Sequence, residues 1–243
     1  MMNDHELAAA IAETAGALLI ELRPTFADPT ELKAAGDAQA NVVILDWLAR
    51  ERPDDAVLSE ESADDLARVG RDRVWIVDPL DGTREYGEGD RDDWAVHVAL
   101  SINGTASIGA VALPAQGTVF STDPRPVVAA RPNGPPRLVV SRTRPPAITG
   151  ALEAALNAEL VPMGSAGAKA MAILQGRVDV YAHAGGQYQW DSAAPVAVCA
   201  AAGLHVSRLD GSPLVYNEAE RALPDLLICR PEYAASVIEV ANR

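Results

Sequence analysis

Two carboxylates three residues apart, Asp78 and Asp81, are the side chains of this sequence best suited to chemistry. They stand in the stretch DPLDGTRE, where a proline follows the first and a glycine the second. Residues 73–77, which are apolar after Arg73, predict a buried strand that ends here, because proline has no N–H to give to a sheet. Carboxylate oxygens suit Mg²⁺, Mn²⁺ or Ca²⁺ rather than zinc, and the amides of Gly82 and Thr83 can turn toward an anion. The stretch predicts a site for hard cations and a phosphate, with a plain surface turn as the alternative.

Two further acidic segments stand at the ends of other predicted elements. Glu60 follows a short apolar strand at 56–59, and Asp191 opens an apolar helix. Each is weak alone, because paired glutamates are usually solvated and an aspartate at a helix start is usually an N-cap. Together with Asp78 and Asp81 they place four carboxylates at the ends of separate elements, which is how multi-metal phosphatase sites are assembled.

Three segments carry a resemblance to a known family: SEES at 59–62, WIVDPLDGT at 75–83 and WDSAA at 190–194. Over nearly its whole length the chain resembles the inositol monophosphatase superfamily of Mg²⁺-dependent, lithium-inhibited phosphatases. Within it, the stretch TREY from Thr83 is similar to the 3′(2′),5′-bisphosphate nucleotidases of the CysQ type, whereas inositol monophosphatases usually have Thr-x-Asn-Phe. The resemblance implies removal of the 3′-phosphate of adenosine 3′,5′-bisphosphate, a by-product of sulfur assimilation, to give AMP. Phosphatases of inositol 1-phosphate or fructose 1,6-bisphosphate are the nearest alternative, and a catalytically silent metal- or nucleotide-binding protein is a more distant one.

The resemblance also implies how the metals are held and how the reaction proceeds. Two or three Mg²⁺ ions are expected, with Mn²⁺ as the alternative. The implied metal ligands are Glu60, Asp78, Asp81, Asp191 and the carbonyl oxygen of Leu80. The implied reaction is in-line attack of water on phosphorus without a phosphoenzyme, for which Glu60, Thr83 and Asp81 are the expected catalytic residues. Glu60 would accept the proton and Thr83 would orient the water.

Most substrate contacts are expected from the second half of the chain. The segment that begins at Ser141 and Arg142 is similar to the Ser-Arg-Ser of the bisphosphate nucleotidases, and it predicts either a hold on the uncleaved phosphate or only a polar turn. The stretch GSAGAK resembles the family's Gly-Ser-Ser-x-Lys run at a helix N-terminus, with one extra residue between Ser165 and Lys169. The expected substrate-binding residues are Gly82, Thr83, Arg84, Ser141, Arg142, Ser165, Lys169 and Asp191.

One position departs from the family pattern. Family members usually carry Thr-x-x-Asp after the first helix, and that Asp supports the third metal. Here the stretch GDAQAN places Asn41 at the expected position, so the third ion would meet only a neutral carbonyl oxygen and bind weakly. Asp37 is the alternative, but it reaches the metals only if the second helix, marked by Val42, Leu45 and Leu48, starts differently.

Charge and composition narrow the set of partners. The 243 residues include 34 acidic and 20 basic ones, and the net charge of −14 argues against polymeric nucleic acid or a membrane as partner. A small phosphorylated substrate stays compatible, because divalent ions bring positive charge to the site. The acidic, polar start of the chain differs from a signal peptide and no stretch approaches a membrane span, so a cytoplasmic enzyme is predicted. The oligomeric state stays open, with a homodimer among the alternatives.

The cysteines and histidines receive no chemical role. Cys199 and Cys229 match no zinc or redox spacing and are expected to be reduced core residues. No histidine has a partner at ligand or triad spacing, so all four are interpreted as packing or surface residues: His5, His97, His183 and His205.

Strands and helices interleave along the chain. A capping pattern at Asn3 and Glu6 predicts a first helix, and Asn103-Gly104 predicts a hairpin between strands at 95–102 and 106–111, with an edge strand at 118–121. The later expected strands are 137–140, 178–181, 204–206 and 226–229, and the later helices are 149–160, 164–175, 191–202 and 231–242. Alternation alone predicts an α/β or α+β class, and the resemblance implies a layered αβαβα sandwich.

A stretch rich in proline, arginine and glycine at 123–136 predicts a seam between two halves. Residues 1–122 are expected to form an α+β half with most of the metal ligands. Residues 123–243 are expected to form an α/β half with the substrate contacts and the last metal ligand.

Overall fold

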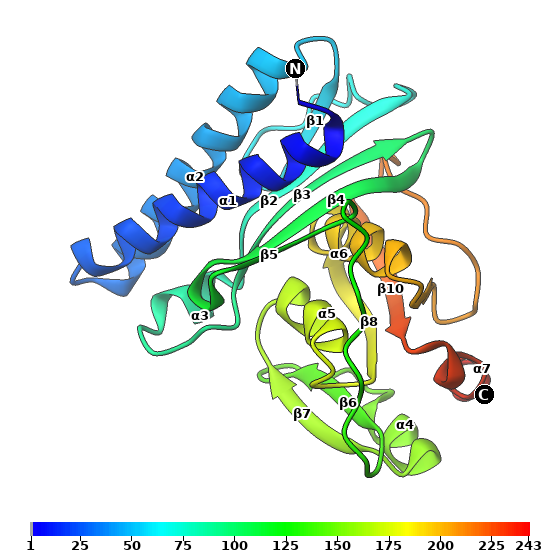
Figure 1. Cartoon of the computed structure of the whole chain (residues 1–243). Helices are drawn as coiled ribbons and strands as arrows, with labels where there is room; N and C mark the ends of the chain where they lie inside the picture. The colour runs from blue at the N-terminus through cyan, green and yellow to red at the C-terminus, as the bar shows by residue number, and fades with distance from the viewer. Residues whose placement is uncertain (1) are drawn as a thin grey trace.

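The computed structural model describes residues 2–243, which contain two five-stranded sheets (Figure 1). The first sheet has the order β1-β2-β3-β4-β5, with strands β1 (Ala56–Ser59), β2 (Arg73–Asp81), β3 (Ala95–Ile102), β4 (Thr105–Leu113) and β5 (Thr118–Ser121). β1 and β2 run parallel, and the other neighbours run antiparallel. The predicted hairpin is confirmed, because Asn103 and Gly104 both have positive φ, 49° and 79°, as a two-residue hairpin turn requires.

Two long helices, α1 (Asp4–Leu22) and α2 (Pro29–Glu51), cover one face of the first sheet (Figure 1). The capping box predicted for Asn3 and Glu6 is confirmed. α2 begins well before the predicted second helix, because the Asp28 side chain accepts a hydrogen bond from the Thr30 amide and Pro29 takes the first helical position. The early start places Asp37 and Asn41 inside the helix.

The second sheet has the order β7-β6-β8-β10-β9, with strands β6 (Arg137–Ser141), β7 (Glu159–Met163), β8 (Val180–Tyr188), β9 (His205–Ser207) and β10 (Ala222–Cys229). Helices α5 (Ala166–Leu174) and α6 (Gln189–Ala201) lie between the two sheets, and α4 (Thr149–Leu156) and α7 (Pro231–Ala241) cover the outer face (Figure 1). Val139 faces the inner core while Leu138 and Val140 face the outer helices, as alternation along a strand requires. The expected αβαβα sandwich is therefore confirmed. Short helical turns complete the description: α3 (Thr83–Gly87), η1 (Arg23–Thr25) and η2 (Pro114–Gln116).

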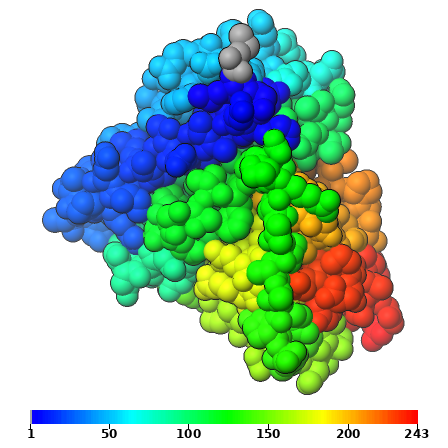
Figure 2. Space-filling view, viewed as in Figure 1, coloured from blue at the N-terminus to red at the C-terminus, as the bar shows by residue number. Residues whose placement is uncertain are grey.

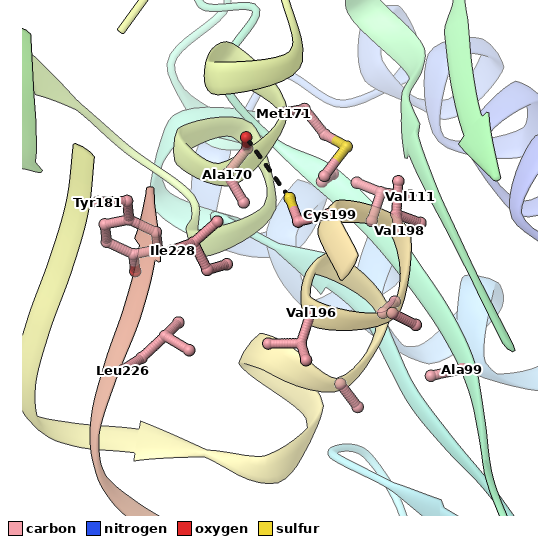
Figure 3. Packing of buried hydrophobic residues seen from close by; sticks show 14 of the residues in the cluster. Ala99, Val111, Ala170, Met171, Tyr181, Val196, Val198, Cys199, Leu226 and Ile228 are labelled. Atoms are coloured by element: carbon pink, nitrogen blue, oxygen red, sulfur yellow. Dashed lines mark hydrogen bonds between the residues drawn. The ribbon is translucent and has the colours of Figure 1, made fainter. Parts of the chain in front are cut away.

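α6 is buried around most of its circumference because both sheets pack on it (Figure 3). Its side chains Val196, Val198 and Cys199 lie in the inner core. Around them are Ala99 and Val111 from the first sheet, Met171 from α5, and Tyr181, Leu226 and Ile228 from the second sheet. Both cysteines are buried and unpaired, as predicted.

The second half differs from the sequence prediction in two places. The helix expected at 149–160 ends at Leu156, because Asn157 adopts a left-handed conformation with φ of 48°, and β7 follows in its place. The strand expected at 178–181 continues to Tyr188, through two glycines at 185 and 186. The cavity described below lies beside this added length of β8.

The link between the two halves, residues 122–136, contains neither helix nor strand. The chain after β5 runs down the surface of the molecule (green in Figure 2). The Ala129 amide donates to the Leu174 carbonyl at 2.8 Å, and Arg131 lies 3.2 Å from the buried carboxylate of Asp179. These contacts hold the link against the second half. Among residues 2–243 no helix has the length and apolar character needed to cross a membrane.

Candidate active site

The paired carboxylates lie at the C-terminal end of β2, where the pairing with β3 is irregular. Asp78 is opposite His97 and Asp81 is opposite Ala95, so β2 carries one extra residue between the two acids. Pro79 falls at this irregularity, which explains why the strand continues past it instead of ending at residue 77. The chain then turns at Gly82, whose φ of 86° favours glycine, and enters α3.

Three buried or half-buried carboxylates converge at this point: Asp78, Asp81 and Asp191 each offer an oxygen within 4.8 Å of the others. Asp191 comes from the first turn of α6, in the opposite half of the molecule. The structure thus brings together three of the four carboxylates that the sequence placed in a metal site. An all-oxygen set of this kind fits a hard divalent cation.

Glu60 adds the fourth carboxylate from the loop after β1. The residue is exposed overall, but its carboxyl group lies among the other acids, where it is hydrogen-bonded to Asp78 and largely shielded from solvent. Burial raises the pKa of Asp78 well above its usual range, and the charges of Glu60, Asp81 and Asp191 raise it further. Burial is also the main cause that raises the pKa of Glu60 to about 7 and that of Asp191 to about 7. The cluster therefore holds more negative charge than its protein surroundings balance, as expected of residues that fit a divalent cation.

Asp81 differs from its neighbours because it has several donors. Its carboxylate accepts hydrogen bonds from the Ser165 hydroxyl and from the amides of Ala166 and Gly167, at 3.1 and 2.7 Å for the amides. Burial raises its pKa, but contact with His97 and these hydrogen bonds outweigh burial, so the pKa of Asp81 falls below its ordinary value. The donors belong to the N-terminal turn of α5, so Asp81 ties the first sheet to the second half.

His97 is a residue of this site that the sequence interpretation missed. It is fully buried on β3, with Nε2 3.2 Å from an Asp81 carboxylate oxygen in an ionic contact and Nδ1 3.0 Å from the Trp190 carbonyl oxygen. The interpretation of His97 as a mere packing residue was therefore wrong. The sequence held little signal for this contact, because the pairing that places His97 opposite Asp78 joins β2 and β3, which no short turn connects.

Asp37, and not Asn41, lies beside Thr83. The Thr83 hydroxyl donates to the Leu80 carbonyl at 3.1 Å, and the Asp37 carboxylate lies near enough to this hydroxyl for it to lower the pKa of Asp37. Burial and then the charge of Glu61 raise the pKa of Asp37 to about 7. The expectation that Asn41 takes the place of the third-metal carboxylate was wrong, because α2 starts at Pro29 and presents Asp37 instead.

Asn41 instead holds the loop that carries Glu60. Its side-chain carbonyl accepts a hydrogen bond from the Ser59 hydroxyl at 2.7 Å, and its amide donates to the Ser62 hydroxyl at 3.2 Å. The two serines flank Glu60 and Glu61. We therefore expect Asn41 to act on the position of Glu60 and not on a metal directly.

Replacing Asn41 with Leu is expected to lower the rate on the order of tenfold, because the Glu60 loop loses both hydrogen bonds and a small misplacement of a catalytic group is costly. Asn41→Asp should keep the loop, since both serine hydroxyls can donate to a carboxylate. Its Mg²⁺ requirement should stay within about twofold of the native one. Mg²⁺ titrations of phosphate release check this, and a several-fold lower requirement in Asn41→Asp would mean that Asn41 faces the ions.

A cavity of about 320 Å³ opens beside the carboxylate cluster, between α3 on one side and β6, α5 and β8 on the other. Asp81 and Asp191 lie at its metal end. Every residue that the sequence assigned to the substrate lines it: Gly82, Thr83, Arg84, Ser141, Arg142, Ser165, Lys169 and Asp191. Glu60, Asp78 and Leu80 are not part of its wall. The cavity wall also includes residues that the sequence did not single out, among them Glu85, Arg144, Tyr181, His183 and Gln187.

Lys169 is the buried cation of the cavity. Its ammonium group donates to the Gly164 carbonyl at 3.2 Å and lies 5.3 Å from the centre of the Tyr181 ring. Burial lowers its pKa, which the charges of Asp81 and other nearby carboxylates oppose. Among residues 2–243 its ammonium group donates a hydrogen bond only to Gly164, so two of its three N–H groups are left to bind an anionic ligand.

An acidic centre between two layered sheets, beside a cavity with cationic walls, defines a class of metal-assisted phosphatase. The chain belongs to the inositol monophosphatase family, whose model matches residues 7–125 and 136–240. It is 55% identical over 230 residues to the 3′-phosphoadenosine 5′-phosphate phosphatase of Mycobacterium tuberculosis (90% of this chain, 86% of the relative). It is 48% identical over 253 residues to the protein of the same name from Mycobacterium leprae (98% and 93%). The crystal structure of CysQ from Bacteroides thetaiotaomicron superposes with a TM-score of 0.76 at 26% identity (92% and 96%).

Proposed function

We propose that this chain is an Mg²⁺-dependent phosphatase that removes the 3′-phosphate of adenosine 3′,5′-bisphosphate and releases AMP. The observation that carries the proposal is that one cavity, of about 320 Å³, combines carboxylates at one end with basic side chains along its wall. A substrate with two phosphates matches both features, one phosphate at the metal end and one among the basic groups. The names of the mycobacterial relatives point to the same substrate. The proposed setting is the cytoplasm, where the enzyme would clear a by-product of sulfur assimilation.

Glu60, Asp78, Asp81, Asp191 and the Leu80 carbonyl are the residues proposed to hold the divalent ions, with Asp37 as a further carboxylate beside them. When bound, Mg²⁺ or Mn²⁺ supplies a Lewis acid that neutralises charge on the phosphoryl oxygens. These residues fit a divalent ion because all of their donor atoms are oxygens. Among residues 2–243, His97 and Lys169 are the cationic side chains found beside the cluster, so part of its negative charge is left for a metal ion to balance. Inhibition by Li⁺ is also expected, because the chain belongs to the inositol monophosphatase family.

The side chains around Thr83 are arranged to deliver water. Its hydroxyl proton is directed to Leu80 or Asp37, which leaves an oxygen lone pair to accept a hydrogen bond from water and orient it toward phosphorus. Glu60 is the proposed proton acceptor, because its carboxyl group lies beside Asp78 in the carboxylate cluster and can take a proton from water there. The residue is exposed overall, which lets the proton leave to solvent after each turnover.

A phosphate-release panel with three substrates tests the proposal. Adenosine 3′,5′-bisphosphate is expected to have a kcat/KM at least about tenfold above inositol 1-phosphate and fructose 1,6-bisphosphate, which is roughly 1.4 kcal/mol of discrimination in the transition state. Assays with EDTA in place of Mg²⁺ serve as the control and should show only background release. Equal or better turnover of inositol 1-phosphate would contradict the proposal.

A further inference from the structure

Four cationic side chains line the cavity, and they differ in how far their charge is already balanced: Arg84, Arg142, Arg144 and Lys169. Lys169 is buried near the carboxylates, and Arg84 directly follows Thr83 at the metal end. Arg142 and Arg144 both lie in the loop after β6, farther along the cavity wall. The uncleaved phosphate of a bisphosphate needs a basic group away from the metal end, so the choice falls between these two arginines.

Arg142 is already held by two carboxylates. Its Nη2 atom lies 2.7 Å from a Glu85 carboxylate oxygen and 2.9 Å from a Glu88 one, and its backbone amide donates to the Met163 carbonyl at 3.0 Å. These hydrogen bonds raise the pKa of Arg142 further above its normal value. Glu88 also lies 3.9 Å from Arg91, and the charge of Arg142 is already balanced by its own two carboxylates, which leaves it little charge to offer a phosphate. We call Arg142, Glu85 and Glu88 the Arg142 cluster.

The Arg142 cluster is built as a fixed connection between the halves. Glu85 belongs to α3 in the first half and is 6% exposed. It packs so closely against Gly164 that a Cβ atom at that glycine would lie 2.3 Å from the Glu85 side chain. Glu85 therefore has no room to release Arg142, and the cluster holds the loop after β6 against α3.

Arg144 has no such partner. It lines the same cavity, is exposed, and makes no ion pair or side-chain hydrogen bond with any residue in the described part of the chain, residues 2–243. Its backbone amide donates to the Ser141 hydroxyl at 3.2 Å, which fixes the turn that carries it. Burial lowers the pKa of the cavity residue His183, and the charges of Lys169 and Arg144 add to this, so Arg144 lies near that wall. An unpaired guanidinium is the group best suited to bind phosphate through two hydrogen bonds.

We infer that Arg144, and not Arg142, binds the phosphate that is not cleaved, and that Arg142 is a positioning residue that holds the Arg144 turn. The inference rests on the proposed function, because it assigns a residue to the second phosphate of the proposed substrate. It also explains the glutamate in the TREY stretch, since Glu85 is the anchor of Arg142.

The test compares two nucleotides that differ only in the second phosphate: adenosine 3′,5′-bisphosphate and adenosine 3′-monophosphate. Arg144→Gln is expected to raise KM for the bisphosphate about tenfold, because a hydrogen-bonded charge is lost, and to leave KM for the monophosphate within about twofold. Arg142→Gln and Glu85→Gln should raise KM for the bisphosphate by less than Arg144→Gln does, because they only loosen the turn that carries Arg144, and they should lower the unfolding temperature. Their double variant should be no worse than either alone. Arg177→Gln, the same charge change at an exposed position outside the cavity, should change neither substrate.

Calorimetry with AMP gives a second readout that does not depend on turnover, because AMP keeps only the uncleaved phosphate. Arg144→Gln should weaken AMP binding about tenfold, and Arg177→Gln should leave it unchanged. A selective loss for the bisphosphate in Arg142→Gln but not in Arg144→Gln would overturn the inference, as would unchanged AMP binding in Arg144→Gln. If the native protein binds AMP through Arg144 but fails to hydrolyse the bisphosphate, the proposed function falls and the assignment of Arg144 stands.

Discussion

Asp78→Asn is expected to lower phosphate release by a factor on the order of 10² or more and, in the absence of metal, to make the protein more stable. The loss of rate follows because Asp78 is proposed as a ligand shared between ions. The gain in stability follows because Asp78 is a buried carboxylate hydrogen-bonded to Glu60 and close to two more acids. An amide of the same shape keeps the hydrogen bond to Glu60 and carries no charge, so folding no longer has to keep a buried acid protonated above its ordinary pKa.

Thermal unfolding in EDTA measures the second effect, and a rise of roughly 3–6 °C is expected, since about 1 kcal/mol moves Tm by 2–4 °C in a chain of this size. Asp225→Asn is the matched control, because that carboxylate is paired with Arg208 at 2.7 Å outside the site. It should lower Tm slightly and leave the rate unchanged. A fully active Asp78→Asn variant would show that the metal site has been misplaced, and a lower Tm in EDTA would show that the carboxylates do not repel one another.

The metal-free protein is expected to lose stability as pH rises from about 5 to 8. The pKa values of Asp191 and Glu60 are raised to about 7 in the folded state, whereas both groups titrate near 4 in an unfolded chain. Between these values the folded state holds more protons, so the stability that these two groups contribute is fully present below about pH 4 and is lost as pH passes through 7. Asp81 does not contribute in this window, because its lowered pKa keeps it ionised throughout.

Tm measured against pH, with EDTA and with excess Mg²⁺, checks this dependence. The fall should be a few degrees in EDTA and should disappear or reverse with Mg²⁺, because a bound cation favours the ionised carboxylates. The slope should also be shallower in Asp78→Asn, which has less repulsion to relieve. Identical slopes with and without Mg²⁺ would mean that the ion does not bind among these carboxylates.

Local patterns in the sequence were sufficient for the layout of the acidic centre. A strand that meets proline and glycine beside two aspartates has to place them at its end. The Asn103-Gly104 turn determines in the same local way that β3 and β4 pair with each other. The error at Asn41 had a local cause as well, because Asp28-Pro29 is a helix start that the apolar pattern around residue 42 obscured. The site was thus predictable as far as neighbouring residues determine it.

Contacts between distant segments could not be predicted in the same way. Arg142 meets Glu85 across 57 residues of sequence, and Asp81 meets the α5 turn across more than 80. Both contacts depend on how the two halves pack, and no spacing rule carries that information. The same limit explains why Arg144, which has no carboxylate partner within the described chain, was not distinguished from the paired Arg142.

The hydrogen bonds from the α5 turn to Asp81 have a consequence for the biosynthesis of this protein. A nascent chain that has emerged only through the first sheet carries Glu60, Asp78 and Asp81, but it has neither Asp191 nor the amides that orient Asp81. Such a chain presents repelling carboxylates without the geometry to capture an ion. We therefore expect the carboxylate cluster to bind its metal only after α6 has left the ribosome and packed against the first sheet. Bound metal would then indicate that the chain has been synthesised at least through α6 and that its two sheets have packed together.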